Sequence, residues 1–218
     1  MTSFPGSPRV LKGAIVLLDP VTFTLLPNGV IALQYNPDSL TRTLKVKGAT
    51  EGGDRSEAMR LTGPPVETIK LDAEIDATDQ LEIVDETALQ YGIFPQLAAL
   101  ETLIYPPSAT LQANFTLAQL GTMEIMPMLA PMSLFAWSAS RVVPVRITDF
   151  SITEEAFDPA LNPLRAKVSL GMQVLSIDDL SLADQGGSLY MAYHRQKESL
   201  AQMHRYGTLA SLGLKGLP

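Results

Sequence analysis

The strongest concentration of groups that could do chemistry is a row of carboxylates, Asp72, Glu74, Asp76 and Asp79. The first three alternate along a predicted strand, so they share one face at intervals of about 6.5 to 7 Å. Carboxylates at this spacing could bind calcium or support acid–base chemistry. Lys70 lies on the same face, however, and a mixed charged row is typical of a solvated or subunit-facing surface. We therefore predict a subunit interface with the candidate residues Lys70, Asp72, Glu74, Asp76, Arg165 and Lys167.

Other side chains that could carry a reaction are few and separated. His194 and His204 lie ten residues apart on a predicted helix, about 15 Å along its axis, so one chain cannot join them at a metal. Both lie in a terminal helix away from any predicted cleft, which argues against a Ser–His–Asp site. Glu154, Glu155 and Asp158 fall at a strand end and turn, where carboxylates commonly solvate the backbone. With no cysteine and no glycine-rich phosphate loop, the sequence predicts neither enzyme activity nor a metal or cofactor.

The composition points to a protein that assembles with other chains. The net charge is −7, which removes the usual electrostatic basis for nucleic-acid binding. The longest apolar runs, at residues 14–18 and 126–132, are far shorter than the roughly 20 residues of a membrane helix. The N-terminus has no basic segment followed by an apolar one, so we expect no signal-peptide export. Charged residues make up 18% of the chain, against a typical 25% or so, which indicates that neighbouring chains cover part of the surface.

Alternation of apolar and polar residues predicts about seven strands. The clearest example places Ile69, Leu71, Ala73 and Ile75 on one side and polar residues on the other. The Pro-Asn-Gly sequence at residues 27–29 predicts a turn that joins the first two strands in a hairpin. We expect strands at residues 10–18, 30–35, 40–47, 68–77, 133–137, 141–154 and 164–177.

Two segments have the helical period instead. In the first helix, with Pro95 in its first turn, apolar residues recur at i, i+4, i+7 and i+11, namely at Ile93, Leu97, Leu100 and Ile104. The second helix is expected at residues 189–206, with a packed stripe formed by Leu189, Tyr193, Leu200 and Met203. Residues 109–131 keep neither period, and we predict an irregular segment with a short strand.

These elements predict a mainly β fold, an antiparallel β-barrel or sandwich with one flanking helix and a C-terminal helical extension. We divide the chain into a flexible N-terminal arm at 1–8, a barrel domain at 9–177 and a helical extension with a tail at 178–218. The polar loop at 48–65 is longer than most connections, so we predict that it contacts a partner along the axis of an assembly. Its candidate contact residues are Gly52, Gly53, Asp54, Arg55, Glu57 and Arg60.

Four segments resemble the tube-protein domain of contractile injection systems. They are residues 35–43 (Tyr-Asn-Pro-Asp-Ser-Leu-Thr-Arg-Thr), 61–76 (beginning Leu-Thr-Gly-Pro-Pro), 93–106 (beginning Ile-Phe-Pro-Gln-Leu) and 144–163 (ending Leu-Asn-Pro). The resemblance runs from about residue 9 to residue 177. It implies a phage-tail-tube type of barrel and six-fold rings. Many relatives also carry a C-terminal LysM domain, for which residues 178–218 are too short and too poor in strand signal.

The resemblance further implies a baseplate protein that forms a hexameric adaptor ring between the spike and the inner tube and initiates tube assembly. Its partners would be copies of itself, the inner-tube protein, the spike protein and other baseplate proteins, without nucleic acid or membrane insertion. It would be assembled in the bacterial cytoplasm as part of a contractile particle, whether released or retained.

Three alternatives remain open at the level of sequence. The chain could be the main inner-tube subunit, which polymerises with itself. It could be a separate β module that binds glycan or peptidoglycan through Trp137 or Tyr35. A metal-dependent hydrolase that uses the carboxylates between Asp72 and Asp79 is the third alternative.

Overall fold

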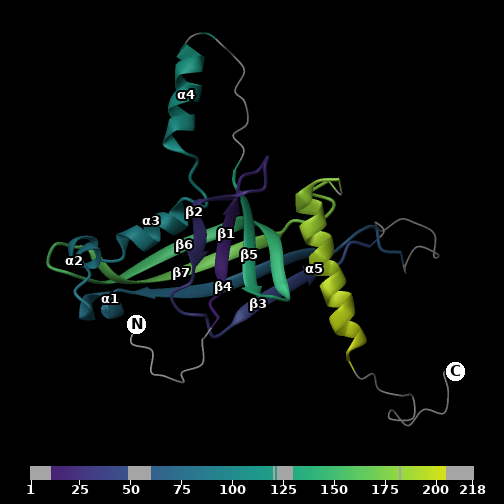
Figure 1. Cartoon of the computed structure of the whole chain (residues 1–218), viewed down its shortest axis with the longest axis horizontal. Coiled ribbons are helices and arrows are strands. Elements are labelled where there is room, and N and C mark those ends of the chain that lie inside the picture. Colours follow the sequence, from purple (N-terminus) through teal and green to yellow (C-terminus); the bar gives the residue numbers. More distant parts are fainter. Residues whose placement is uncertain (1–10, 49–59, 120, 122–129, 182, 205–218) are drawn as a thin grey trace.

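The computed structural model describes residues 11–48, 60–119, 121, 130–181 and 183–204. Seven strands form a single sheet in the order β2-β1-β5-β6-β7-β4-β3, and all neighbouring pairs are antiparallel (Figure 1). The strands are β1 (Ala14–Leu18), β2 (Leu25–Ala32), β3 (Leu40–Lys45), β4 (Val66–Asp76), β5 (Met132–Ser138), β6 (Arg141–Phe157) and β7 (Pro163–Val174). The predicted mainly β, antiparallel class is confirmed. A ladder between the outer strands β2 and β3 is not part of this sheet, so the described residues do not close it as a barrel.

The two strands with the clearest alternation are neighbours in the sheet. β4 and β7 pair from Thr68 opposite Gln173 to Asp76 opposite Arg165. Their apolar rows all turn to the core, and each fully buried large side chain contributes roughly 1.5 to 3 kcal/mol. These rows consist of Ile69, Leu71, Ala73 and Ile75 on β4 and Ala166, Val168, Leu170, Met172 and Val174 on β7.

The first hairpin has its turn in a different place from the predicted one. The chain reverses between β1 and β2 at Asp19, whose carboxylate accepts hydrogen bonds from the backbone N–H groups of Val21 and Thr22. β2 then runs straight through the Pro-Asn-Gly sequence, where Asn28 has φ +57° and the β1–β2 register shifts. The positive φ expected of this sequence therefore produces a bulge rather than the hairpin turn, because Asp19 already caps a turn nearer to β1.

Four helices lie between β4 and β5, where the sequence predicted one. They are α1 (Thr78–Glu82), α2 (Glu86–Tyr91), α3 (Phe94–Glu101) and α4 (Ser108–Gln119). α3 is the predicted helix, with proline in its first turn and buried Leu97 and Leu100. Ile104, expected on the same stripe, follows the end of α3 and is exposed. α1 and α2 are too short for a helical period to be visible in the sequence.

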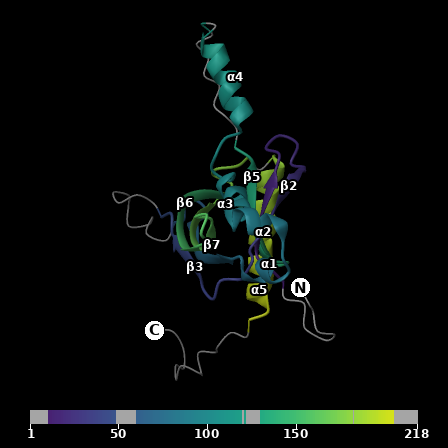
Figure 2. The ribbon, with the colours of Figure 1, turned by 90° about the vertical axis from the view of Figure 1, so that its left-hand side faces the viewer.

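α4 corrects the prediction of an irregular segment with a short strand after residue 109. Polar and apolar residues alternate from Ser108 to Leu117, which is the period of a strand. The segment is nevertheless helical, because its alanine, leucine and glutamine residues favour a helix and no strand among the described residues lies beside it to form a ladder. α4 projects from the rest of the molecule, and none of its side chains is buried (Figures 1 and 2).

The C-terminal helix α5 (Gln185–Gln202) begins four residues earlier than predicted and packs with its first half against the sheet (Figure 1). Its buried residues are Gly186, Gly187, Tyr190 and Tyr193, so of the predicted stripe Tyr193 is buried whereas Leu200 and Met203 are exposed. Glycine allows the first turn of α5 to pack this closely, because a Cβ on Gly186 would lie only 3.0 Å from the Leu180 side chain. The buried part of the helix therefore lies nearer to its start than the sequence predicted. No helix of the described residues is long and apolar enough to cross a membrane.

Seen end-on, the sheet is strongly curled, and α3 lies over its inner side (Figure 2). A single hydrophobic cluster joins residues of the sheet with α3 and with Tyr190 and Tyr193 of α5. The side chain of Gln34, just after β2, connects this part of the chain to the end of β4. It donates to the Asp76 carbonyl (2.6 Å) and accepts from the Asp76 N–H (3.0 Å). β4 extends past the end of β3 at this point, so Gln34 takes the place of a strand partner.

Candidate assembly surfaces

The predicted interface residues lie on one outward face of β4 and β7. The register places Glu74 opposite Lys167 and Asp76 opposite Arg165, so charges of opposite sign are paired across the two strands. The Arg165 Nε lies 2.7 Å from an Asp76 carboxylate oxygen and 3.7 Å from one of Glu74. Asp72 lies opposite Ser169, and Lys70 opposite Gly171. We call Lys70, Asp72, Glu74, Asp76, Arg165 and Lys167 the charged face.

The electrostatics of the charged face are those of a solvated ion-pair network. Burial raises the pKa of Asp76, but hydrogen bonds from Thr78 and Arg165 outweigh burial and hold that pKa below its usual value. Lys167 is paired with Glu155 of β6 at 3.1 Å, a residue that the sequence reasoning placed only at a strand end. Exposed pairs of this kind contribute little to stability, about 0 to 1 kcal/mol each, but they give direction to association. No three His, Asp or Glu side chains in the described part of the chain converge as a metal site.

A second charged group, which the sequence reasoning missed, surrounds Glu67 at the start of β4. The Glu67 carboxylate is buried, with 3% of the residue exposed, and binds Arg42 of β3 at 2.6 Å and Lys197 of α5 at 2.8 Å. The Tyr193 hydroxyl donates to it at 2.9 Å, and the Lys197 ammonium lies 4.0 Å from the Tyr193 ring centroid. We call these four residues the Glu67 cluster. A signal was present: Glu67 has the same parity as Ile69 and Leu71, so it is a carboxylate on the core-facing row.

The Glu67 cluster keeps its carboxylate ionised. Burial alone raises the pKa of Glu67, but hydrogen bonds from Lys197, Arg42 and Tyr193, together with the charge of Lys197, outweigh it and lower the pKa. The pKa of the Tyr193 hydroxyl is raised, by burial first and then by the charge of Glu67. All potential partners of the carboxylate are therefore held as donors, which makes the cluster a lock between α5 and the β3–β4 edge and not an acid–base site.

An apolar surface lies at the end of the sheet where α1 to α3 meet the β6–β7 turn. The two parts are in direct contact, because the Asn162 side chain donates to the Gln90 carbonyl and the Ile93 N–H donates to the Pro163 carbonyl. Gly92, at φ +58°, makes this approach possible, since an added Cβ would lie 2.2 Å from the Pro163 carbonyl oxygen. We call the exposed large residues here the apolar end surface: Ile83, Val84, Tyr91, Phe94, Phe157 and Leu161.

Two residues of the apolar end surface are held in an unfavourable backbone conformation. Val84 has φ +56° and Leu161 has φ +67°, values that β-branched and bulky residues rarely adopt. Both side chains are more than 60% exposed, at 66% for Val84 and 76% for Leu161. Asparagine would suit both positions better in an isolated protein, so these residues are poorly explained by the stability of a single chain.

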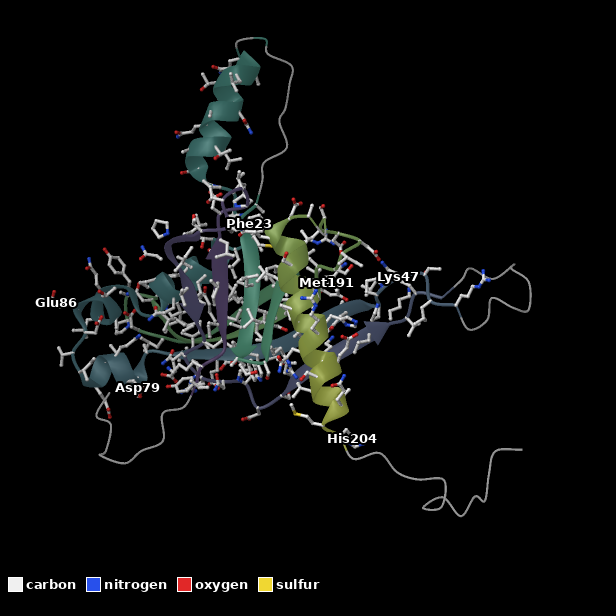
Figure 3. The ribbon with its side chains drawn as sticks, turned by 45° about the vertical axis from the view of Figure 1, so that its right-hand side comes forward. Phe23, Lys47, Asp79, Glu86, Met191 and His204 are labelled. Carbon is white, nitrogen blue, oxygen red and sulfur yellow. The ribbon has the colours of Figure 1, made fainter. Side chains whose placement is uncertain are left out.

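The predicted axial loop lies mostly outside the described residues, as do the N-terminal arm at 1–8 and the tail after 204. Of its candidate residues, Gly52, Gly53, Asp54, Arg55 and Glu57 are outside, and Arg60 is described. The two sides of the loop meet at a bridge between Gly48 and Leu61. Figure 3 shows that Lys47 beside this bridge and Glu86 of α2 lie toward opposite ends of the sheet. The loop therefore starts at the end opposite to the apolar end surface.

The aromatic residues proposed to bind glycan are both engaged within the chain. The Trp137 ring stacks on the buried Phe135 ring with a centroid distance of 5.8 Å, and a Cβ on Gly13 would lie 2.9 Å from it. Tyr35 is partly exposed, with its hydroxyl 3.4 Å from an Asp79 carboxylate oxygen. The stacking explains Trp137 as a part of the fold, whereas Tyr35 keeps 41% of its surface exposed.

Comparisons with known proteins leave the family open. No family model matches the chain, and no curated protein matches it. A solved structure described as "Tail of empty GTA particle computed with helical refinement, C6 symmetry" contains a chain that aligns over 74% of this chain and 89% of its own length, at 12% identity and a TM-score of 0.28. Similarity at this level decides neither the fold nor the function of the chain.

Proposed function

We propose that this protein is a structural subunit of a phage-tail-like contractile injection system. In this proposal six copies form an adaptor ring that joins the spike to the inner tube and initiates tube assembly, in contact with other baseplate proteins. The protein acts by association alone, without catalysis or a cofactor, and it is assembled in the bacterial cytoplasm. The resemblance of residues 35–43, 61–76, 93–106 and 144–163 to the tube-protein domain supports this reading.

The observation that carries the proposal is the apolar end surface. Six large apolar side chains gather at one end of the sheet, and two of them are kept there at a cost in backbone strain. Exposed large apolar side chains concentrated at one end of a folded chain are typical of a contact surface. The opposite end carries the predicted axial loop, so the two ends of the sheet offer different surfaces to a partner below and a partner above. An adaptor between two unlike structures needs such a polarity.

The experiment replaces both strained residues in one variant, Val84→Asn and Leu161→Asn. Asparagine tolerates positive φ, so the isolated chain should keep or raise its melting temperature while the apolar end surface loses two of its six apolar side chains. Native mass spectrometry should show six-fold rings for both chains, whereas co-sedimentation with the tube and spike proteins should be retained by the natural chain and weakened in the variant. A matched control, Leu200→Gln on the exposed half of α5, should leave both the rings and this binding intact.

Two results would contradict the proposal. A natural chain that stays monomeric at all concentrations, alone and with tube and spike proteins, would exclude a ring subunit. Open-ended stacks of many rings without tube protein would instead assign the chain as the main inner-tube subunit.

A further inference from the structure

Within the described part of the chain, α4 has no buried side chain that would account for its stability. It has 12 residues, and none of its side chains is buried. Isolated helices shorter than about 12 to 15 residues are marginal in water. The chain from Thr102 to Gln119 also contains no charged residue, although charged residues make up 18% of the protein. An exposed helix without charges is therefore a helix whose partner is another molecule.

The side chains of α4 form two apolar stripes on opposite sides. Leu111, Phe115 and Ala118 follow one another at i, i+4 and i+7, and Phe115 is 66% exposed. The other stripe has the small residues Ala109 and Ala113, followed by Leu117 as its one large residue. The larger apolar area lies on the Phe115 stripe, so this stripe is the one that docks.

A cavity with matching chemistry opens at the root of the same helix. Its volume is about 460 Å³, and its walls come from the β1–β2 turn, the segment before α4 and strands β5 and β6. The lining is apolar apart from Ser133 and Arg146, and the Arg146 guanidinium is bonded to Gln173 at 3.0 Å. Most of the lining is apolar, and the single charged side chain, Arg146, is held by Gln173, so the uncharged and partly apolar surface of α4 suits the greater part of these walls.

The helix cannot enter the cavity of its own chain. Ile104 forms part of the cavity wall, and α4 begins only four residues later and points away from the body (Figure 1). Figure 2 shows the same projection from a second direction. An α4 that docks in this cavity must therefore belong to another copy of the chain.

The size of the contact favours a copy that is already adjacent. A helix of 12 residues is about 18 Å long. If one face of such a helix is buried in a groove, the accessible surface lost by the helix and the groove together is about 700 Å². A specific interface on its own needs about 1,000 Å² or more. The arm can thus strengthen a contact between chains that already touch, but it cannot recruit a free partner.

We propose that α4 of one copy docks its Leu111–Phe115 stripe into the cavity at the root of α4 on the next copy. This inference rests on the proposed function, in which copies of the chain lie side by side. Each copy gives one arm and receives one, a head-to-tail contact that forms a ring when the rotation between neighbouring copies closes.

The test uses the absence of cysteine from the chain. One preparation carries Ala118→Cys, on the Phe115 stripe, and a second, distinguished by a mass tag, carries Ile104→Cys on the rim of the cavity. Both positions are exposed, so neither change should affect folding, and Leu111 and Phe115 are kept. After mixing under assembly conditions and mild oxidation, mass spectrometry should find a disulfide between the two differently tagged chains. Ala113→Cys, on the opposite stripe, is the matched control and should give little cross-link.

A second variant measures the contribution of the arm without cysteine chemistry. Phe115→Ser should leave the melting temperature unchanged and raise the concentration at which the rings dissociate by at least about tenfold. Rings that form normally without the mixed disulfide and without a response to Phe115→Ser would overturn the docking of α4 and leave the proposed function in place. Equal cross-linking from Ala113→Cys would overturn it too. A chain that remains monomeric would reject both.

Discussion

Replacing Glu67 by glutamine tests whether the Glu67 cluster locks α5 to the sheet. The substitution keeps the shape of the side chain but leaves Arg42 and Lys197 without their common anion. Removing one partner of a buried ion pair costs about 3 to 5 kcal/mol. The side chains of Arg42 and Lys197 are 27% and 35% exposed, so water recovers part of that loss, and we expect about 2 to 3 kcal/mol.

Urea denaturation of the isolated chain measures this loss, and a melting curve should show a decrease of roughly 5 to 10 °C for a protein of this size. Hydrogen exchange should become faster in α5 before it does in β4 and β7, because the lost contacts hold the helix. The control is Glu74→Gln on the same strand, where the carboxylate is half exposed and the expected loss is below about 0.5 kcal/mol.

The same variant predicts a pH dependence. The pKa of Glu67 is lowered from 4.5 in the folded chain, so its ionised form contributes full stability above 4.5, and this contribution is lost as the pH falls through the folded pKa. The difference in stability between the natural chain and Glu67→Gln should therefore be largest at neutral pH and shrink below pH 4.5. An equal decrease in the free energy of unfolding for Glu67→Gln and Glu74→Gln, or a difference from the natural chain that does not change with pH, would refute the claim that the Glu67 cluster holds α5 on the sheet.

Two further substitutions test how the ends of the sheet are closed. Gly92→Ala should destabilise the chain by about 2 kcal/mol or more in chemical denaturation, because its Cβ would lie 2.2 Å from the Pro163 carbonyl oxygen at a φ of +58°. Gly48→Ala, where a Cβ meets nothing within 4 Å, should change stability by less than about 0.5 kcal/mol, and a similar effect for both would contradict the close approach. Gln34→Ala should cost about 1 to 2 kcal/mol and speed exchange of the Asp76 amide, since it removes two hydrogen bonds; unchanged exchange would show that Gln34 does not serve as a strand partner.

The β-sheet was predictable because its strands have one wet and one buried face. β4 and β7 alternate over their whole length, and burial of one row then fixes both the face and the register. The charged face followed from the same alternation, which is why Glu74 and Asp76 were expected on one side. Lys167 and Arg165 were predicted at the same interface. Which of them lies opposite Glu74 and which opposite Asp76 depends on the register between β4 and β7.

The features that the sequence did not predict correctly depend on contacts between distant residues or on competing local signals. The Asn-Gly sequence at residues 28 and 29 signals positive φ, but whether that makes a turn or a bulge was decided by Asp19. α4 has the alternation of a strand and the composition of a helix, and the absence of a neighbouring strand decides between them. The Glu67 cluster joins positions 126 and 130 residues apart, which no local pattern can show.

The Glu67 cluster also determines how late in synthesis the β3–β4 edge can reach its final structure. β3 and β4 leave the ribosome early, yet the Lys197 that neutralises Glu67 is made 130 residues later. Until α5 has emerged, a nascent chain holds a carboxylate on its core-facing row with only Arg42 to meet it, and burial of that row remains costly. Truncated or unfinished chains therefore lack the contacts that complete the β3–β4 edge, and translation must reach the C-terminal helix before this edge is complete.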